Sequence, residues 1–120
     1  MKTKKQLLRA EADKYWHQAV FNKYGQVCEV CGRLAVHSHH FYPKGLYSSL
    51  RYEISNGVPL CFHCHFSRHH KGDPKINQTI IAKRGKSWYN KLKKQAQKPP
   101  INYQTTIGYY ETAIKELTKL

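Results

Sequence analysis

The sequence predicts a small α+β domain, with helices at both ends and a short β region between them. Apolar residues recur at intervals of three and four over residues 3–23 and 106–119, which is the period of a helix with one buried face. Between these segments, two Cys-x-x-Cys pairs enclose a histidine-rich stretch broken by proline and glycine, which favours short strands and loops. The chain has 120 residues, a length typical of one domain.

The first third of the chain is expected to form a helix followed by short strands. The helix covers residues 3–23 and ends before Gly25, since glycine commonly stops helices. Short strands are expected near residues 33–41, before Pro43 and Gly45. We expect the helix to bury one stripe that is apolar apart from Glu11 and is made of Leu7, Leu8, Glu11, Ala12, Tyr15, Trp16, Ala19 and Val20.

The middle of the chain is expected to hold a loop and then a helix. Residues 44–55 fit a loop or a short helix, and Asn56-Gly57 is a turn signal. A helix is expected from about residue 61 to about residue 71. Successive helical residues are ~100° apart, so Phe62 and Phe66 fall away from the cysteines and histidines. We expect these two phenylalanines to face the core.

The rest of the chain is expected to be helical. Asp73-Pro74 combines an N-capping carboxylate with proline at the first helical position. Gly85 separates helices over 74–84 and 86–97, and a last helix covers 106–119. We expect a single domain made of an N-terminal helix (1–25), a core (26–72) and a basic helical extension (73–120).

The four cysteines predict a structural zinc site. They form two pairs, Cys28 with Cys31 and Cys61 with Cys64. Four thiolates hold zinc tetrahedrally at ~2.3 Å and leave it no open position. Disulfides are the alternative, and four reduced cysteines packed as small apolar residues are a second one. The two-residue spacing within each pair favours zinc.

The histidines predict a second metal site of a different kind. His65 and His69 are four residues apart, so they share one face of a helix. The cluster of His37, His39 and His40 can supply a further ligand. A single histidine is more often a polar surface residue, but five so close to a zinc motif favour a site that binds metal through imidazole.

The pattern His39-His40-Phe-Tyr-Pro43, Asn56, Pro59-Leu60-Cys61-x-x-Cys64-His65 and His69 resembles the HNH endonucleases. The resemblance covers about residues 26–71 and points to the subgroup with a four-cysteine zinc. It implies a ββα-metal unit that hydrolyses DNA to a 5′-phosphate and a 3′-hydroxyl.

The resemblance also implies a role for each matched residue. His39, His65 and His69 become ligands of a catalytic divalent ion, His40 becomes the general base, and Asn56 positions the loop that bears the base. Mg²⁺, Mn²⁺, Ni²⁺ and Zn²⁺ all suit such ligands. His37, which would share a strand face with His39, is an alternative ligand or an outer partner of the site.

The charge of the chain predicts a nucleic acid partner. Lysine and arginine number 21 against 7 aspartates and glutamates, which gives a net charge of +14. A merely soluble basic surface is the alternative, and RNA is not excluded as the substrate. We expect DNA contacts from Arg68, Lys71, Lys83, Arg84, Lys86, Lys91, Lys93 and Lys94. Arg68 is equally well a solvated surface residue.

The segment around Trp88 and Tyr89 interleaves these cations with large aromatics. The lysines could grip the DNA backbone while the aromatics pack on the core, and we expect a mixture of both. The tail resembles, loosely, that of phage recombination nucleases of the NinG/Rap type.

The chain carries no apolar leader at its start and no apolar run of the ~20 residues that span a bilayer. We therefore expect a soluble cytoplasmic protein, bacterial or encoded by a phage. The function favoured is a DNA endonuclease, and the rival is a non-catalytic zinc module that only binds nucleic acid.

Overall fold

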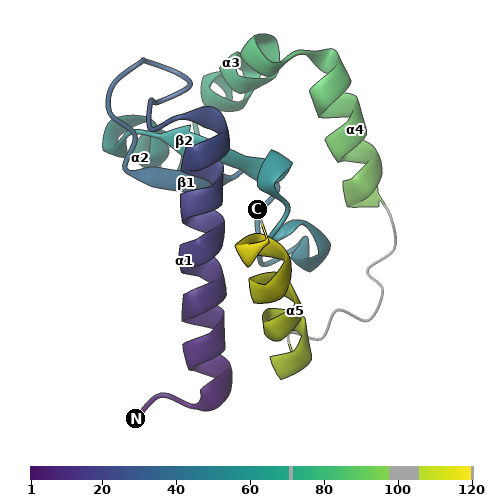
Figure 1. The fold of residues 1–120 in the computed structure, drawn as a ribbon. Helices are drawn as coiled ribbons and strands as arrows, with labels where there is room; N and C mark the ends of the chain where they lie inside the picture. The colour runs from purple at the N-terminus through teal and green to yellow at the C-terminus, as the bar shows by residue number, and fades with distance from the viewer. Residues whose placement is uncertain (71, 98–105, 120) are drawn as a thin grey trace.

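The computed structural model describes residues 1–70, 72–97 and 106–119, without the side chains of residues 69 and 70 (Figure 1). Its helices and strands are α1 (Lys4–Tyr24), β1 (His37–His40), β2 (Gly57–Leu60), α2 (Phe62–His70), α3 (Pro74–Arg84), α4 (Lys86–Gln97) and α5 (Ile107–Thr118). Two 3-10 turns, Ser48–Leu50 and Ile54–Asn56, interrupt the connection between the strands. The predicted α+β class is confirmed.

The helix ends follow local signals in the sequence. Thr3 accepts a hydrogen bond from the backbone N–H of Gln6, whose side chain accepts one from the N–H of Thr3. Asp73 caps α3 by accepting from the N–H of Lys75. Gly85, at φ +94°, separates α3 from α4 where the sequence predicts the break. None of the described helices is long and apolar enough to cross a bilayer.

The two strands form an antiparallel pair in which His37 lies opposite Leu60 and His40 opposite Gly57. The order β1, β2, α2 is the ββα arrangement that the resemblance implies. The turn signal at Asn56-Gly57 lies at the end of the 3-10 turn Ile54–Asn56, where the N–H of Gly57 donates to the carbonyl of Ile54, and Gly57 then begins β2. The strands are joined by a long loop, so no tight hairpin is needed there.

The long helix α1 packs against α5 and crosses the sheet (Figure 1). Its buried residues are Ala12, Trp16 and Val20, which are four apart. The predicted stripe is too wide, since Leu7 is 56% exposed and Tyr15 is 37% exposed. Ala12 packs with Tyr110 and Ala113 of α5, and Trp16 and Val20 pack with Leu117.

A larger core surrounds the cysteines and is shared by the sheet, α3 and α4. It contains Phe41, Leu50, Val58, Leu60, Ile76, Ile80 and Leu92. The expectation that Phe62 and Phe66 face this core is wrong, because they are 67% and 40% exposed. The inner side of α2 is taken by Cys64 and His65, which leaves the two phenylalanines on the outside.

Gly57 allows the close approach of α1 to β2, and its replacement tests that contact. A Cβ at this position would overlap Cγ2 of Val20 and lie 3.0 Å from Cζ2 of Trp16. We expect Gly57→Ala to lower the free energy of unfolding by about 1–3 kcal/mol, the usual cost of overpacking. Urea denaturation measures it. Gly45→Ala is the control, since a Cβ at Gly45 meets nothing within 4 Å. Equal stabilities of the two variants would contradict this account.

Candidate active site and zinc centre

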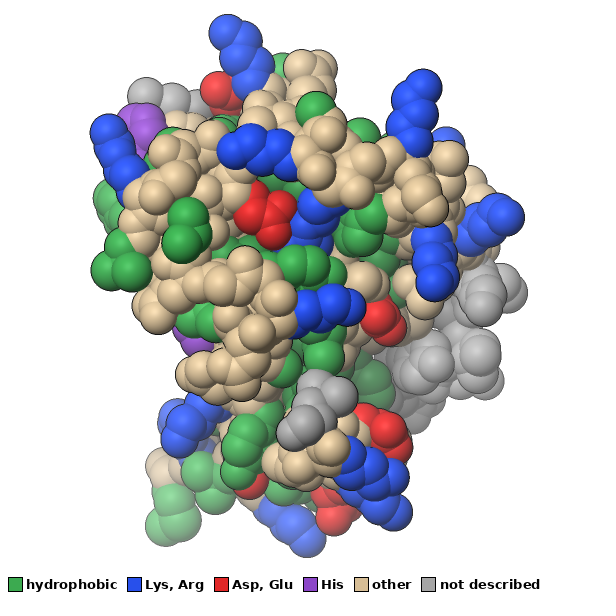
Figure 2. All heavy atoms as spheres, turned by 45° about the horizontal axis from the view of Figure 1, so that its top comes forward, with side chains coloured by type: hydrophobic (Ala, Val, Ile, Leu, Met, Phe, Trp, Pro, Cys, Tyr) green, Lys and Arg blue, Asp and Glu red, His purple; other side chains and the backbone are tan. Residues whose placement is uncertain are grey.

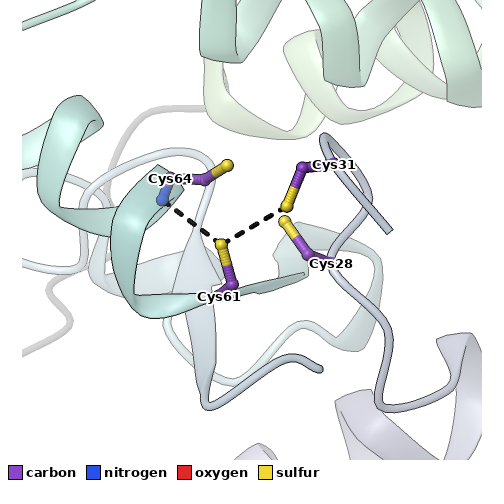
Figure 3. Close-up of side chains that lie close together, drawn as sticks. All are labelled: Cys28, Cys31, Cys61 and Cys64. Carbon is purple, nitrogen blue, oxygen red and sulfur yellow. Dashed lines mark hydrogen bonds between the residues drawn. The ribbon is translucent and has the colours of Figure 1, made fainter. Parts of the chain in front are cut away.

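The four cysteine sulfurs converge on one point between β2, α2 and the loop before β1 (Figure 3). All four Sγ atoms lie within 4.8 Å of one another, and those of Cys31 and Cys61 are 3.5 Å apart. A tetrahedral site with Zn–S bonds of ~2.3 Å needs sulfurs about 3.8 Å apart. The donor set and the spacing therefore fit a structural zinc.

The backbone around the first pair explains why this sequence forms a metal knuckle. The N–H of Gly32, at φ +80°, donates to the carbonyl of Cys28 over 2.9 Å, and the N–H of Cys28 donates to the carbonyl of Arg33 over 2.7 Å. Burial raises the pKa of Cys28, but nearby backbone N–H groups outweigh it and lower the pKa to about 7. The backbone is thus arranged to stabilise a thiolate.

An ion pair between Glu29 and Arg84 connects the loop of the first cysteine pair to α3. The carboxylate of Glu29 accepts from Nε of Arg84 over 2.8 Å and also from Nη2, while Nη1 donates to the carbonyl of Ser55. The guanidinium also lies 3.8 Å above the ring of Tyr24. We predict Arg84 as a DNA contact, but its side chain is only 8% exposed and bonded on both sides. We therefore remove Arg84 from the predicted DNA-binding set.

The alternation of β1 separates the histidines onto two sides of the strand. His37 and His39 lie on the side of α2, where the ring centres of both are close to that of His65, at 4.2 Å and 5.5 Å. Two imidazoles that bind one ion with metal–nitrogen bonds of ~2.1 Å have ring centres roughly 5 Å apart. The pair His39 and His65 fits that geometry, with His39 buried.

The third ligand implied by the resemblance is His69, on the next turn of α2. Its side chain lies outside the described residues, as does Lys71. Among the side chains that the structure describes, the cysteines are the one group of three or more whose ligand atoms cluster tightly enough for an ion. The described histidines alone do not complete a site, so a third ligand depends on His69.

His40 lies on the opposite side of β1, toward α1. Its ring stacks on that of Trp16 with centroids 3.9 Å apart and planes 8° from parallel. Its Nε2 is 2.9 Å from the carbonyl oxygen of Arg51. A carbonyl only accepts, so Nε2 carries the proton and Nδ1 holds the lone pair. Burial, with the charges of Lys44 and Arg51, lowers the pKa of His40 to about 4, so its ring is neutral at physiological pH.

Asn56 is fully buried and fastens the loop that follows β1. Its Oδ1 accepts from the N–H of Tyr42 over 2.8 Å. Its Nδ2 donates to the carbonyls of Tyr42 and Leu50, both over 3.1 Å. The residue after Leu50 is Arg51, whose carbonyl accepts from His40, so one stretch of backbone links the hydrogen bonds of Asn56 to that of His40.

Both histidine groups open into one cleft of about 530 Å³ between α1, β1 and α2. Its walls include Asp13, Trp16 and His17, three residues from α1 that the sequence analysis does not assign to the site. Asp13 pairs with Arg51 over 3.0 Å and accepts from the hydroxyl of Tyr52 over 2.7 Å. The sequence does contain a signal for this wall, because the spacings of three and four from Asp13 to Trp16 and His17 place these residues on one face of a helix.

The predicted DNA-binding residues fall into two groups. Arg68 is half-buried at the edge of the cleft, where its Nε donates to Oδ1 of Asn77 over 3.1 Å. The exposed group contains Lys83, Lys86, Lys91, Lys93 and Lys94. Blue lysine and arginine side chains project from several places on the face drawn in Figure 2.

Comparison with known families identifies the central segment. Residues 28–71 match the family model described as HNH endonuclease. Residues 28–71 form an HNH endonuclease domain. No curated protein and no solved structure matches the chain.

The HNH match confirms the predicted class of enzyme, because HNH endonucleases are phosphodiester hydrolases. It implies nuclease activity and a nucleic acid substrate. The HNH segment spans the four cysteines, both strands and α2, whereas α1, α3, α4 and α5 lie outside it. The wall of the cleft formed by Asp13, Trp16 and His17 therefore lies outside the matched segment.

Proposed function

We propose that the protein is a metal-dependent DNA endonuclease in which His40 is the general base. One observation carries the proposal: His40 and the pair His39 and His65 lie on opposite sides of one strand and open into the same cleft. A binding module needs neither a neutral histidine held at a fixed angle nor a second group of imidazoles beside it.

The residues of the chain would divide the work as follows. The carbonyl of Arg51 and the ring of Trp16 hold His40 so that Nδ1 takes a proton from the attacking water. Negative phosphate in the cleft would raise the lowered pKa of His40 and make it a better base. His39, His65 and His69 would hold a divalent ion, which supplies charge stabilisation to the phosphate and to the leaving oxygen. The products would carry a 5′-phosphate and a 3′-hydroxyl.

A cleavage assay tests the proposal. We expect plasmid DNA to be cut in the presence of one or more of Mg²⁺, Mn²⁺, Ni²⁺ and Zn²⁺. The rate of DNA cleavage is compared with the rate of cleavage of RNA of equal length. The double substitution of His65 and His69 by alanine should abolish cleavage. It should also abolish the binding of the catalytic divalent ion, measured by calorimetry, while the zinc ion held by the four cysteines remains bound. Binding of the ion at full strength in this variant would show that the ligands are others.

DNA binding should depend steeply on salt, because lysines that contact phosphates displace counterions. We expect replacement of Lys91, Lys93 and Lys94 by glutamine to reduce the slope of log affinity against log salt by up to about 2.7, at ~0.9 for each lost contact. Binding to duplex DNA in EDTA measures it without cleavage.

The control removes the same charge elsewhere. Lys2, Lys4 and Lys5 are also exposed but lie at the start of α1, so their replacement should change the slope less. Equal effects of the two triple variants would mean that net charge alone acts. The resemblance of the tail to phage recombination nucleases stays a prediction.

A further inference from the structure

A second cleft lies directly beside the active-site cleft. It has a volume of about 610 Å³ and is bounded by the loop after β1, the start of α3 and α4. Pro43 and Arg68 line both clefts, so the two are adjacent. Its volume is in the range of ~300–1,000 Å³ typical of sites for small ligands or for single groups of larger ones.

The walls of this second cleft are aromatic. Tyr42, Tyr47 and Tyr89 line it together with Phe41. The rings of Tyr42 and Tyr47 meet edge to face with centroids 5.0 Å apart, and the ring of Phe41 packs edge to face on Tyr42 at 5.4 Å. The three tyrosines are half-buried and line the cleft. Such walls offer flat, rigid surfaces on which another flat group can stack.

The remaining lining is polar and carries a cation at the junction. Asn77 and Gln78 present side-chain amides from α3, and the amide oxygen of Asn77 orients Arg68 through the 3.1 Å hydrogen bond. Among the described residues the guanidinium makes no other hydrogen bond, so its remaining N–H donors can bind an anion at the boundary of the two clefts. Aromatic walls, amide edges and a cation on one side match a nucleotide, which has a flat base, polar base edges and a phosphate.

We propose that this second cleft binds an unpaired base of the DNA strand whose phosphate lies in the active-site cleft. The substrate class is then DNA with an unpaired nucleotide beside the cut, and the inference rests on the proposed endonuclease function. A base inside a duplex has both faces covered by its neighbours and cannot enter a concave pocket. An unpaired base enters without the cost of breaking a pair.

The test measures binding alone, in the His40→Ala background and without added divalent ions. Three duplexes of one sequence are compared: fully paired, with one extra unpaired nucleotide, and with an abasic residue in place of that nucleotide. We expect the unpaired base to bind roughly 5- to 150-fold more tightly than the abasic residue, the range set by stacking of one base on an aromatic side chain.

Substitutions of tyrosine test whether the preference for an unpaired base comes from the second cleft. Tyr47→Ala should abolish it while leaving the affinity for the paired duplex nearly unchanged, and Tyr47→Phe should retain it because the ring remains. Tyr15→Ala, which removes a partly exposed tyrosine of α1, is the matched control and should retain the preference too. Circular dichroism verifies that each variant is folded.

The outcomes separate this inference from the proposed function. Equal affinity for the unpaired and abasic duplexes would overturn the base-binding cleft, as would a preference that survives Tyr47→Ala. Either result leaves an active wild-type endonuclease untouched. A preference that needs Tyr47 in a protein that cuts no DNA would instead uphold the cleft and reject the nuclease.

Discussion

Replacing His40 with alanine is expected to reduce the rate of DNA cleavage by about 10²- to 10⁴-fold, the usual contribution of a positioned acid or base. The physical reason is that Nε2 is held by the carbonyl of Arg51, so Nδ1 is the one proton acceptor that the ring presents. Single-turnover cleavage with saturating protein measures the chemical step. Folding, zinc content and DNA affinity should change little, because the ring of Trp16 remains in place.

His37→Ala is the matched control for this experiment. His37 lies on the other side of β1 and stacks on His65, away from Trp16 and Arg51. Its loss should weaken cleavage far less than the loss of His40. An inactive His37 variant together with an active His40 variant would mean that the general base is His37, three residues earlier in the sequence, and not His40. Wild-type protein that cuts no DNA with any of the four metals would leave the non-catalytic zinc module as the better account.

Loss of one zinc ligand is expected to unfold the domain or to destabilise it severely. Cys28 and Cys64 are buried at opposite ends of the segment that holds both strands, and the ion would fasten these ends together. In zinc-dependent folds the free energy of metal binding is folding free energy, so Cys28→Ser or Cys64→Ser removes much of the stability. Thermal unfolding followed by circular dichroism measures the loss, and elemental analysis should find about one zinc per wild-type chain after EDTA washing.

Phe62→Ser serves as the control, because Phe62 follows Cys61 directly but is 67% exposed. Its stability should stay near that of the wild type. A cysteine variant that keeps the wild-type melting temperature, or a wild-type chain that folds without zinc, would reject the structural role of the metal.

Much of the fold could be predicted because local signals decide it. Helix ends depend on Thr3, Gly25, Asp73 and Gly85, which act through their own backbone or through residues within one turn. The cysteine spacing is equally local within each pair. These features need no knowledge of what the rest of the chain does.

The parts that failed depend on contacts between distant segments. Phe62 is exposed because other residues of α2 occupy the inner side of the helix. The helical period alone does not show which face of α2 is buried. Trp16 is a core residue as predicted, but the sequence does not indicate that its ring stacks on that of His40. The charge of Arg84 predicts a surface role, but the acidic partner Glu29 lies 55 residues earlier. Sequence period and composition are blind to such pairs.

The Glu29–Arg84 pair also joins the first cysteine pair to a residue that is synthesised after all four cysteines. Chains that end before residue 84 contain every cysteine but leave Glu29 without its partner. In the folded chain both side chains are largely buried, and each neutralises the charge of the other. An incomplete chain therefore holds every zinc ligand but lacks the guanidinium that packs beside the first cysteine pair. The last turn of α3 is thus needed to complete the surroundings of the zinc site, although it supplies no ligand.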